Sequence, residues 1–119
     1  MDKLDLMLKR QAELQEHLGV TSKLRTKADE QKYINQMLLA IHEETVEIMR
    51  ETAYKNPDYV EFGWKKNQVF NSEGFKNELA DLFHFVLNLV LISKMTSDEL
   101  FTRYMDKNQE NHERKNGGY

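Results

Sequence analysis

Residues that break helices are scarce in this chain. One proline, Pro57, and five glycines occur among its 119 residues. Apolar residues recur at three- and four-residue intervals, and no alternating pattern is long enough for a useful strand. The sequence therefore predicts an all-α protein. Its length suffices for one domain, spanning residues 1–119.

Apolar periodicity predicts four helical segments. They cover residues 2–18, about 29–55, about 73–94, and a fourth stretch that begins after a capping box formed by Thr96 and Glu99. Gly19 suits the end of the first helix, and Pro57 is expected to end the second. The fourth helix is expected to fade within KNQENHERKNGGY. Because the second and third helices are apolar over a wide arc, we expect a small antiparallel four-helix bundle that forms oligomers.

Composition excludes several classes of protein. The net charge of −3 lacks the basic surplus of a protein that binds nucleic-acid polymers. The absence of cysteine rules out disulfides and cysteine-ligated zinc. Charges interrupt the apolar positions of MDKLDLMLKRQ, unlike a signal peptide, and LFHFVLNLVLIS is too short to span a bilayer. We therefore expect a cytoplasmic protein without membrane or nucleic-acid-polymer partners.

Two acidic pairs lie on the second and third predicted helices. Glu44 and Glu47 occur in HEETVEIMRE, and Glu78 and Asp81 occur in FKNELADLFHF. The spacing of three residues places each pair on one helical face. Four carboxylates at one helix interface would repel each other unless a cation bound them, and Mg²⁺ prefers oxygen ligands. Solvated charges on amphipathic helices show the same spacing, so these residues alone leave both interpretations open.

The two acidic segments resemble the motifs of the all-α nucleoside triphosphate pyrophosphatases, a superfamily that includes MazG-like proteins and dimeric dUTPases. LMLKRQAEL, WKKN and the tail YMDKNQENHERKNGGY are similar to segments of the dimeric dUTPases. The tail residues that carry this similarity are Lys107, Asn108, Asn111, Arg114, Gly118 and Tyr119. The resemblance implies a Mg²⁺-dependent enzyme that converts dUTP and water to dUMP and pyrophosphate. It also implies a homodimer, although the MazG-like size permits a tetramer.

The resemblance assigns roles to particular residues. It makes Glu44, Glu47, Glu78 and Asp81 the metal ligands. Glu44 is also expected to activate the attacking water, with Glu43 as an alternative. The expected phosphate-binding residues are Lys65, Lys107, Asn108, Asn111 and Arg114, and the expected base-binding residues are Gln11, Gln15 and Trp64.

Some features depart from the dUTPase pattern. The chain is shorter than members of that family usually are, Lys115 stands where their tail usually has glutamine, and the opening motif is only partly kept. The alternatives are a MazG-like pyrophosphatase with another nucleoside triphosphate substrate, or a non-catalytic helical interaction module. His84 is expected at an interface or behind the ligands rather than on the metal.

Overall fold

The structure, a computed structural model, describes residues 2–52, 61–63 and 69–117. Its main elements are α1 (Lys3–His17), a 3₁₀ turn (Thr21–Lys23), α2 (Lys27–Arg50), α4 (Ser72–Ile92) and α5 (Ser97–Gly117). Within the described ranges no strand occurs, so the prediction of an all-α fold is confirmed. Pro57, Trp64 and Lys65 lie outside these ranges.

Local caps set the ends of α1 and α2. Asp2 accepts a hydrogen bond from the Asp5 backbone and begins α1, which ends just before Gly19, as predicted. A capping box between Thr26 and Asp29 begins α2 two residues earlier than expected. The helix ends at Arg50, earlier than the predicted end at about residue 55. At this end of α2, the Glu51 carbonyl accepts a hydrogen bond of 2.8 Å from the backbone N–H of Asn71, which comes just before α4.

A bend separates α4 from α5. The two helix axes differ by 107°, and Lys94 in the linker has a φ of 64°. The Thr96 hydroxyl accepts a hydrogen bond from the Glu99 backbone and begins α5, which supplies one half of the expected capping box. The expected fading of this helix is wrong, because α5 continues to Gly117. Ion pairs three and four residues apart along its surface support the helix over its polar length.

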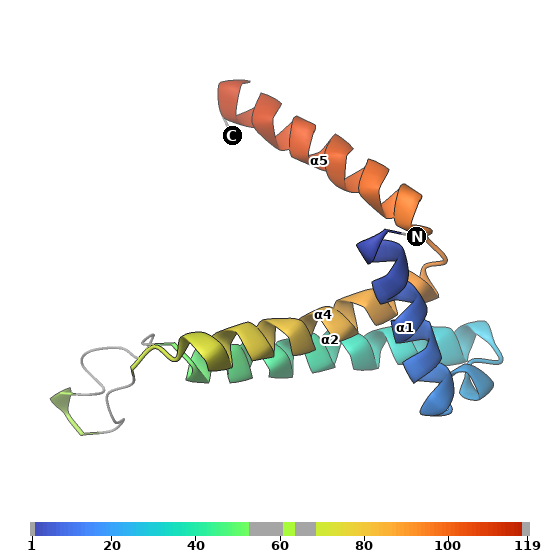
Figure 1. The fold of residues 1–119 in the computed structure, drawn as a ribbon, viewed down its shortest axis with the longest axis horizontal. Coiled ribbons are helices and arrows are strands. Elements are labelled where there is room, and N and C mark those ends of the chain that lie inside the picture. Colours follow the sequence, from blue (N-terminus) through green and yellow to red (C-terminus); the bar gives the residue numbers. More distant parts are fainter. Residues whose placement is uncertain (1, 53–60, 64–68, 118–119) are drawn as a thin grey trace.

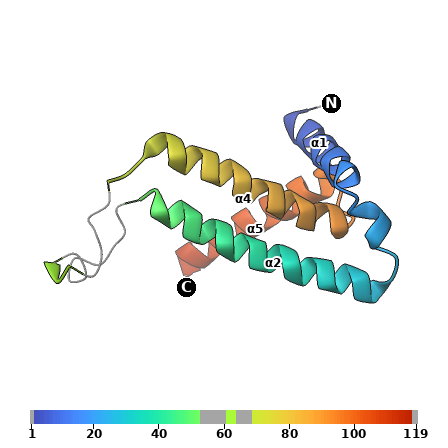
Figure 2. The same ribbon diagram turned by 90° about the horizontal axis from the view of Figure 1, so that it is seen from below.

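Helices α2 and α4 lie antiparallel and side by side, and α1 crosses α4 (Figures 1 and 2). Their register can be read from two contacts. The Asn88 amide nitrogen lies 3.5 Å from the Met37 sulfur, and a Cβ atom at Gly74 would lie 2.6 Å from a carboxylate oxygen of Glu51. In both pairs the residue numbers add up to 125, so the same register runs along the whole helix pair.

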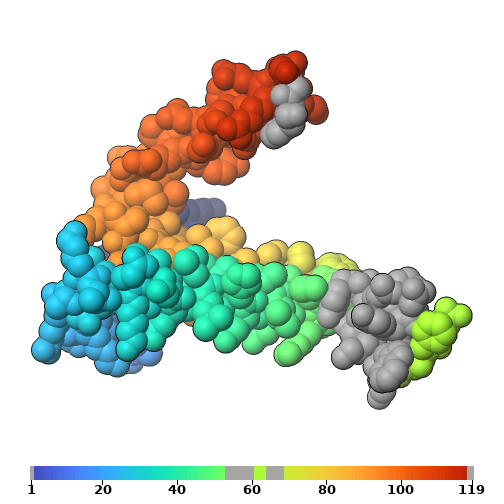
Figure 3. Space-filling model, turned by 180° about the vertical axis from the view of Figure 1, so that it is seen from behind, coloured from blue at the N-terminus to red at the C-terminus, as the bar shows by residue number. Residues whose placement is uncertain are grey.

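The chain buries little apolar surface by itself. Among the described residues, four hydrophobic side chains are buried: Leu8, Tyr33, Leu87 and Val90. The accessible surface is 9614 Å², against about 6800 Å² for a compact monomer of this mass. The radius of gyration is 18.5 Å, against about 13.5 Å for a compact domain of this length. Figure 3 shows one contribution to both values, since α5 stands away from the body formed by α2 and α4.

Within the described ranges, no single helix has the length and apolar character needed to cross a membrane. The bent pair of α4 and α5 meets that test of length and composition only when the two helices are taken together.

Candidate active site

The antiparallel register brings the two acidic motifs together. It places Glu44 of α2 opposite Asp81 of α4, and Glu47 opposite Glu78, since both pairs of numbers also add up to 125. One carboxylate oxygen each from Glu44, Glu47 and Glu78 lies within 4.8 Å of the others. All three side chains are half-buried. Three of the four predicted metal ligands therefore form one cluster, and the fourth, Asp81, lies exposed beside it.

Two oxygens in this cluster have no ordinary partner. The Oε2 atoms of Glu44 and Glu78 are buried, and neither accepts a hydrogen bond from a described residue. Buried polar atoms are usually hydrogen-bonded, and a buried carboxylate is costly unless it is paired or coordinates a metal. Oxygens that share one octahedral Mg²⁺ lie about 3–4 Å apart, and the three carboxylate oxygens lie within 4.8 Å of one another. The arrangement fits a divalent cation.

The cluster changes the acidity of its own carboxyls. Burial, followed by the charges of Glu47, Asp81 and Glu78, raises the pKa of Glu44 to about 7. Burial and the neighbouring Glu47 also raise the pKa of Glu78. Both raised pKa values mean that the carboxylate forms of Glu44 and Glu78 are destabilised, and a bound cation would relieve this. They also leave Glu44 able to exchange a proton near neutral pH.

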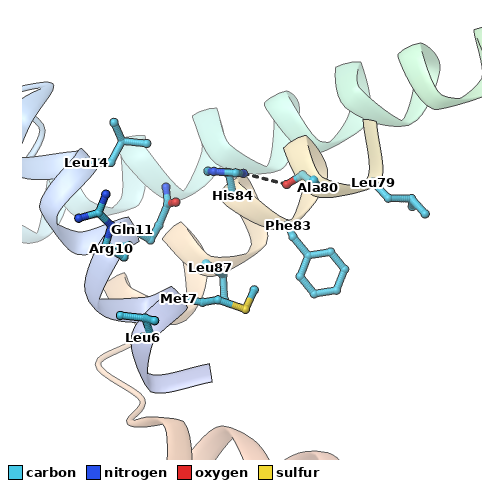
Figure 4. A pocket seen from close by; sticks show the side chains of 10 residues that line it. All are labelled: Leu6, Met7, Arg10, Gln11, Leu14, Leu79, Ala80, Phe83, His84 and Leu87. Atoms are coloured by element: carbon cyan, nitrogen blue, oxygen red, sulfur yellow. Dashed lines mark hydrogen bonds between the residues drawn. The ribbon is translucent and has the colours of Figure 1, made fainter. Parts of the chain in front are cut away.

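A pocket of about 780 Å³ opens between α1 and α4 (Figure 4). It is mostly apolar, and its polar side chains are Arg10, Gln11 and His84. His84 Nδ1 lies 2.8 Å from the Ala80 carbonyl oxygen and must donate to it, which leaves Nε2 available to a ligand. His84 lies in this pocket rather than in the carboxylate cluster, so its assignment away from the metal is consistent with its position.

A chain of buried amides connects the pocket to α2. The Gln11 Nε2 atom donates to Asn88 Oδ1 at 2.7 Å, and Asn88 Nδ2 points to the Met37 sulfur. Gln15 has a different partner, because its side-chain oxygen accepts a hydrogen bond from the Tyr33 hydroxyl. The two predicted base-binding glutamines thus have separate surroundings. The sequence interpretation missed Asn88, although it is the single polar residue within the apolar run FVLNLVLI.

Comparison with known proteins places the chain in a family. A family model described as dUTPase matches residues 3–97, which include α1, α2 and α4. The chain belongs to this dUTPase family. A dCTP pyrophosphatase of Enterobacteria phage T4 is 48% identical over 44 residues, which are 37% of this chain and 26% of that protein. The matched stretch thus spans about a quarter of the relative's length. No solved structure matches.

The tail of this dUTPase-family chain is not near its carboxylates. Residues 98–117 lie beyond the family match, and α5 projects away from α2 and α4 (Figure 1). Lys107 and Arg114 both pair with Glu110 on the same helix, at 3.1 and 2.6 Å. These two cations lower the pKa of Glu110. Within one chain, the structure does not bring Lys107, Asn108, Asn111 or Arg114 to the acidic cluster.

Proposed function

We propose that this chain is a Mg²⁺-dependent nucleoside triphosphate pyrophosphatase that converts dUTP and water to dUMP and pyrophosphate. The observation that carries the proposal is the carboxylate cluster, with its two buried and unpartnered oxygens on Glu44 and Glu78. Membership of the dUTPase family supports the choice of substrate. The proposed protein is a single domain over residues 1–119 and is cytoplasmic.

The four acidic residues would bind the metal, and one of them would also accept a proton. Glu47, Glu78 and Asp81, together with Glu44, would hold Mg²⁺. The bound ion would supply positive charge against the phosphates and make an attacking water more acidic. Glu44 accepts the proton of that water as the bond between the α- and β-phosphates breaks. Glu43 is exposed on the neighbouring position and is the weaker candidate.

We further propose that a second copy of the chain completes the site. The isolated chain exposes about 2800 Å² more surface than a compact monomer, well above the roughly 800 Å² per partner of a standard interface. Part of this surface is apolar and lies on α5, where Phe101, Tyr104 and Met105 are exposed. A homodimer, or a tetramer built from it, would cover this helix. It would also carry Lys107, Asn108, Asn111 and Arg114 to the partner's carboxylates.

Mixed oligomers test this arrangement. Glu47→Gln removes a metal ligand, and Arg114→Ala removes a phosphate contact, so each variant alone should lose most of its activity. If the tail acts on the partner's site, co-refolding the two variants in equal amounts regenerates about a quarter of the wild-type sites, because half of the dimers are mixed and each holds one intact site. Activity no greater than that of the separate variants would contradict a shared site.

A second candidate substrate has its own support. The similarity to a phage dCTP pyrophosphatase favours a related enzyme that acts on dCTP or another nucleoside triphosphate. Both candidates use the same carboxylates and differ only in the base pocket. The third interpretation, a non-catalytic helical module, leaves the unpartnered oxygens of Glu44 and Glu78 without an explanation.

A substrate panel separates these functions. Purified protein with Mg²⁺ is incubated with each deoxynucleoside triphosphate, and pyrophosphate release is measured. We expect the highest kcat/KM for dUTP and loss of turnover in Glu44→Gln and Asp81→Asn with unchanged helical content. Faster turnover of dCTP would favour the second candidate. The proposal fails if no triphosphate yields pyrophosphate and none raises the melting temperature with Mg²⁺.

A further inference from the structure

The buried amide pair Gln11–Asn88 lies in the wall between the pocket and α2. We infer that Asn88 is a positioning residue that fixes the Gln11 amide, so that its carbonyl oxygen faces the base and selects uracil over cytosine. This inference rests on the proposed function, because it assigns the base preference of the same site.

The hydrogen-bond geometry determines which atoms of Gln11 are left for a ligand. Gln11 and Asn88 are only 5% and 8% exposed, and the bond from Gln11 Nε2 to Asn88 Oδ1 measures 2.7 Å. Asn88 in turn directs Nδ2 at the Met37 sulfur, which can accept but has no hydrogen to donate. The sulfur thus sets the orientation of Asn88, and Asn88 sets that of Gln11. One hydrogen of Gln11 Nε2 is therefore donated to Asn88, and Gln11 Oε1 forms no hydrogen bond with a described residue.

The amide pair also lies at the right place for a base. Asn88 is seven residues after Asp81 on α4, and Met37 is seven residues before Glu44 on α2. Seven residues are two helical turns, so these positions share one face and are separated by about 10.5 Å along the axis. Asn88 and Met37 therefore lie on the same faces of α4 and α2 as Asp81 and Glu44, two turns away from them. One sugar between a base and a phosphate chain bridges a separation of this order.

The orientation of the amide matters because the two pyrimidines differ at N3. Uracil carries a hydrogen on N3 and donates it, whereas N3 of cytosine has no hydrogen and can only accept. A fixed carbonyl oxygen accepts from uracil N3 and repels the lone pair of cytosine N3. A glutamine that could rotate by 180° would offer either edge and would accommodate both bases. Figure 4 shows the Gln11 amide between α1 and His84, at the wall of the pocket.

Two variants and one modified substrate test the inference. Asn88→Leu keeps the branching and the number of heavy atoms of the side chain, with somewhat bulkier methyl groups, and removes the acceptor for Gln11. Asn88→Asp keeps that acceptor. Asn77→Ala, an exposed position on the same helix, is the matched control. For each protein, kcat and KM are measured with dUTP, with dCTP and with dUTP methylated at N3. Thermal melting with Mg²⁺ alone monitors folding.

We expect wild type to prefer dUTP over both other substrates. Asn88→Leu should reduce the dUTP-to-dCTP ratio of kcat/KM about tenfold, mainly through KM for dUTP, the size of one hydrogen bond to a buried partner. Asn77→Ala should keep the ratio. Asn88→Asp buries a carboxyl and is expected to melt at a lower temperature, but the folded variant should keep the ratio because its carboxylate still accepts from Gln11. A merely structural role would lower the melting temperature of Asn88→Leu and leave the ratio unchanged.

The outcomes separate this inference from the proposed function. If wild type hydrolyses triphosphates without distinguishing dUTP from dCTP or from the N3-methylated substrate, the inference is wrong and the function stands; this result needs no variant to fold. An unchanged preference in folded Asn88→Leu also overturns it. If wild type hydrolyses no triphosphate, the proposed function fails and the inference fails with it.

Discussion

The raised pKa of Glu44 predicts that Mg²⁺ affinity depends on pH in the neutral range. A metal binds the carboxylate form, so protons compete with it for Glu44. With a Glu44 pKa of about 7, the apparent Mg²⁺ affinity is below that of the fully deprotonated protein by a factor of about 1.1 at pH 8 and about 11 at pH 6. We therefore expect Mg²⁺ to bind about tenfold more weakly at pH 6 than at pH 8. The raised pKa of Glu78 acts in the same direction.

Calorimetry measures both the affinity and the protons released. Mg²⁺ is titrated into the nucleotide-free protein at pH 6, 7 and 8, in two buffers with different heats of ionisation. A pKa of about 7 corresponds to release of about 0.9 proton at pH 6 and about 0.1 at pH 8 from Glu44. Glu43→Gln changes an exposed neighbour outside the cluster and should keep both trends.

The sign of the effect follows from the direction of the shift. A carboxyl whose pKa is raised in the folded state stabilises the metal-free protein at pH below about 4.5. That contribution is lost as pH rises through about 7. The metal-free melting temperature should thus fall over this range, and Mg²⁺ should restore it most at pH 8. Equal affinity and no proton release between pH 6 and pH 8 would refute the reasoning that the cluster holds Glu44 partly protonated.

Four further substitutions have defined outcomes. Glu44→Gln should raise the unfolding free energy of metal-free protein at pH 8 by about 1–2 kcal/mol, after allowance for solvent screening, while turnover is lost; chemical denaturation and pyrophosphate release measure the two effects. Thr26→Ala removes the capping box of α2 and should cost about 1 kcal/mol in urea unfolding, with kcat unchanged. Leu8→Ala opens the small core and should cost about 2–3 kcal/mol; a loss below 1 kcal/mol would show that this core contributes little. Arg114→Ala should raise KM for the triphosphate and leave Mg²⁺ affinity unchanged, as measured by steady-state kinetics and calorimetry.

Sequence reasoning succeeded where structure depends on near neighbours. The start of α5 at Thr96 and the end of α1 before Gly19 depend on groups within four residues, and both were predicted. The end of α2 was predicted too late, because it is fixed by a backbone hydrogen bond from Asn71, twenty residues further along the chain than Glu51. The tail was expected to fray, but ion pairs around Glu110 keep it helical.

The candidate site was predicted only in part, for a related reason. Helical spacing places Glu44 and Glu47 on one face, but it does not specify which residues of α4 lie opposite them. That depends on the antiparallel register, which sets Glu47 against Glu78. The partnership of Gln11 with Asn88 joins residues 77 positions apart, and periodicity within one helix contains no information on it.

The bend at Lys94 limits which insertions and deletions the chain can tolerate between α4 and α5. A lysine with a φ of 64° costs roughly 1–2 kcal/mol, and it sets the direction in which a whole helix leaves the body of the protein. Residues 93–96 form a non-helical turn between α4 and α5, so adding or deleting one residue there would change both the direction and the rotation with which α5 leaves the body. All helices would persist and the protein would melt normally, yet Lys107 and Arg114 would face elsewhere. The number of residues in this linker is therefore as much a part of the proposed enzyme as any single side chain.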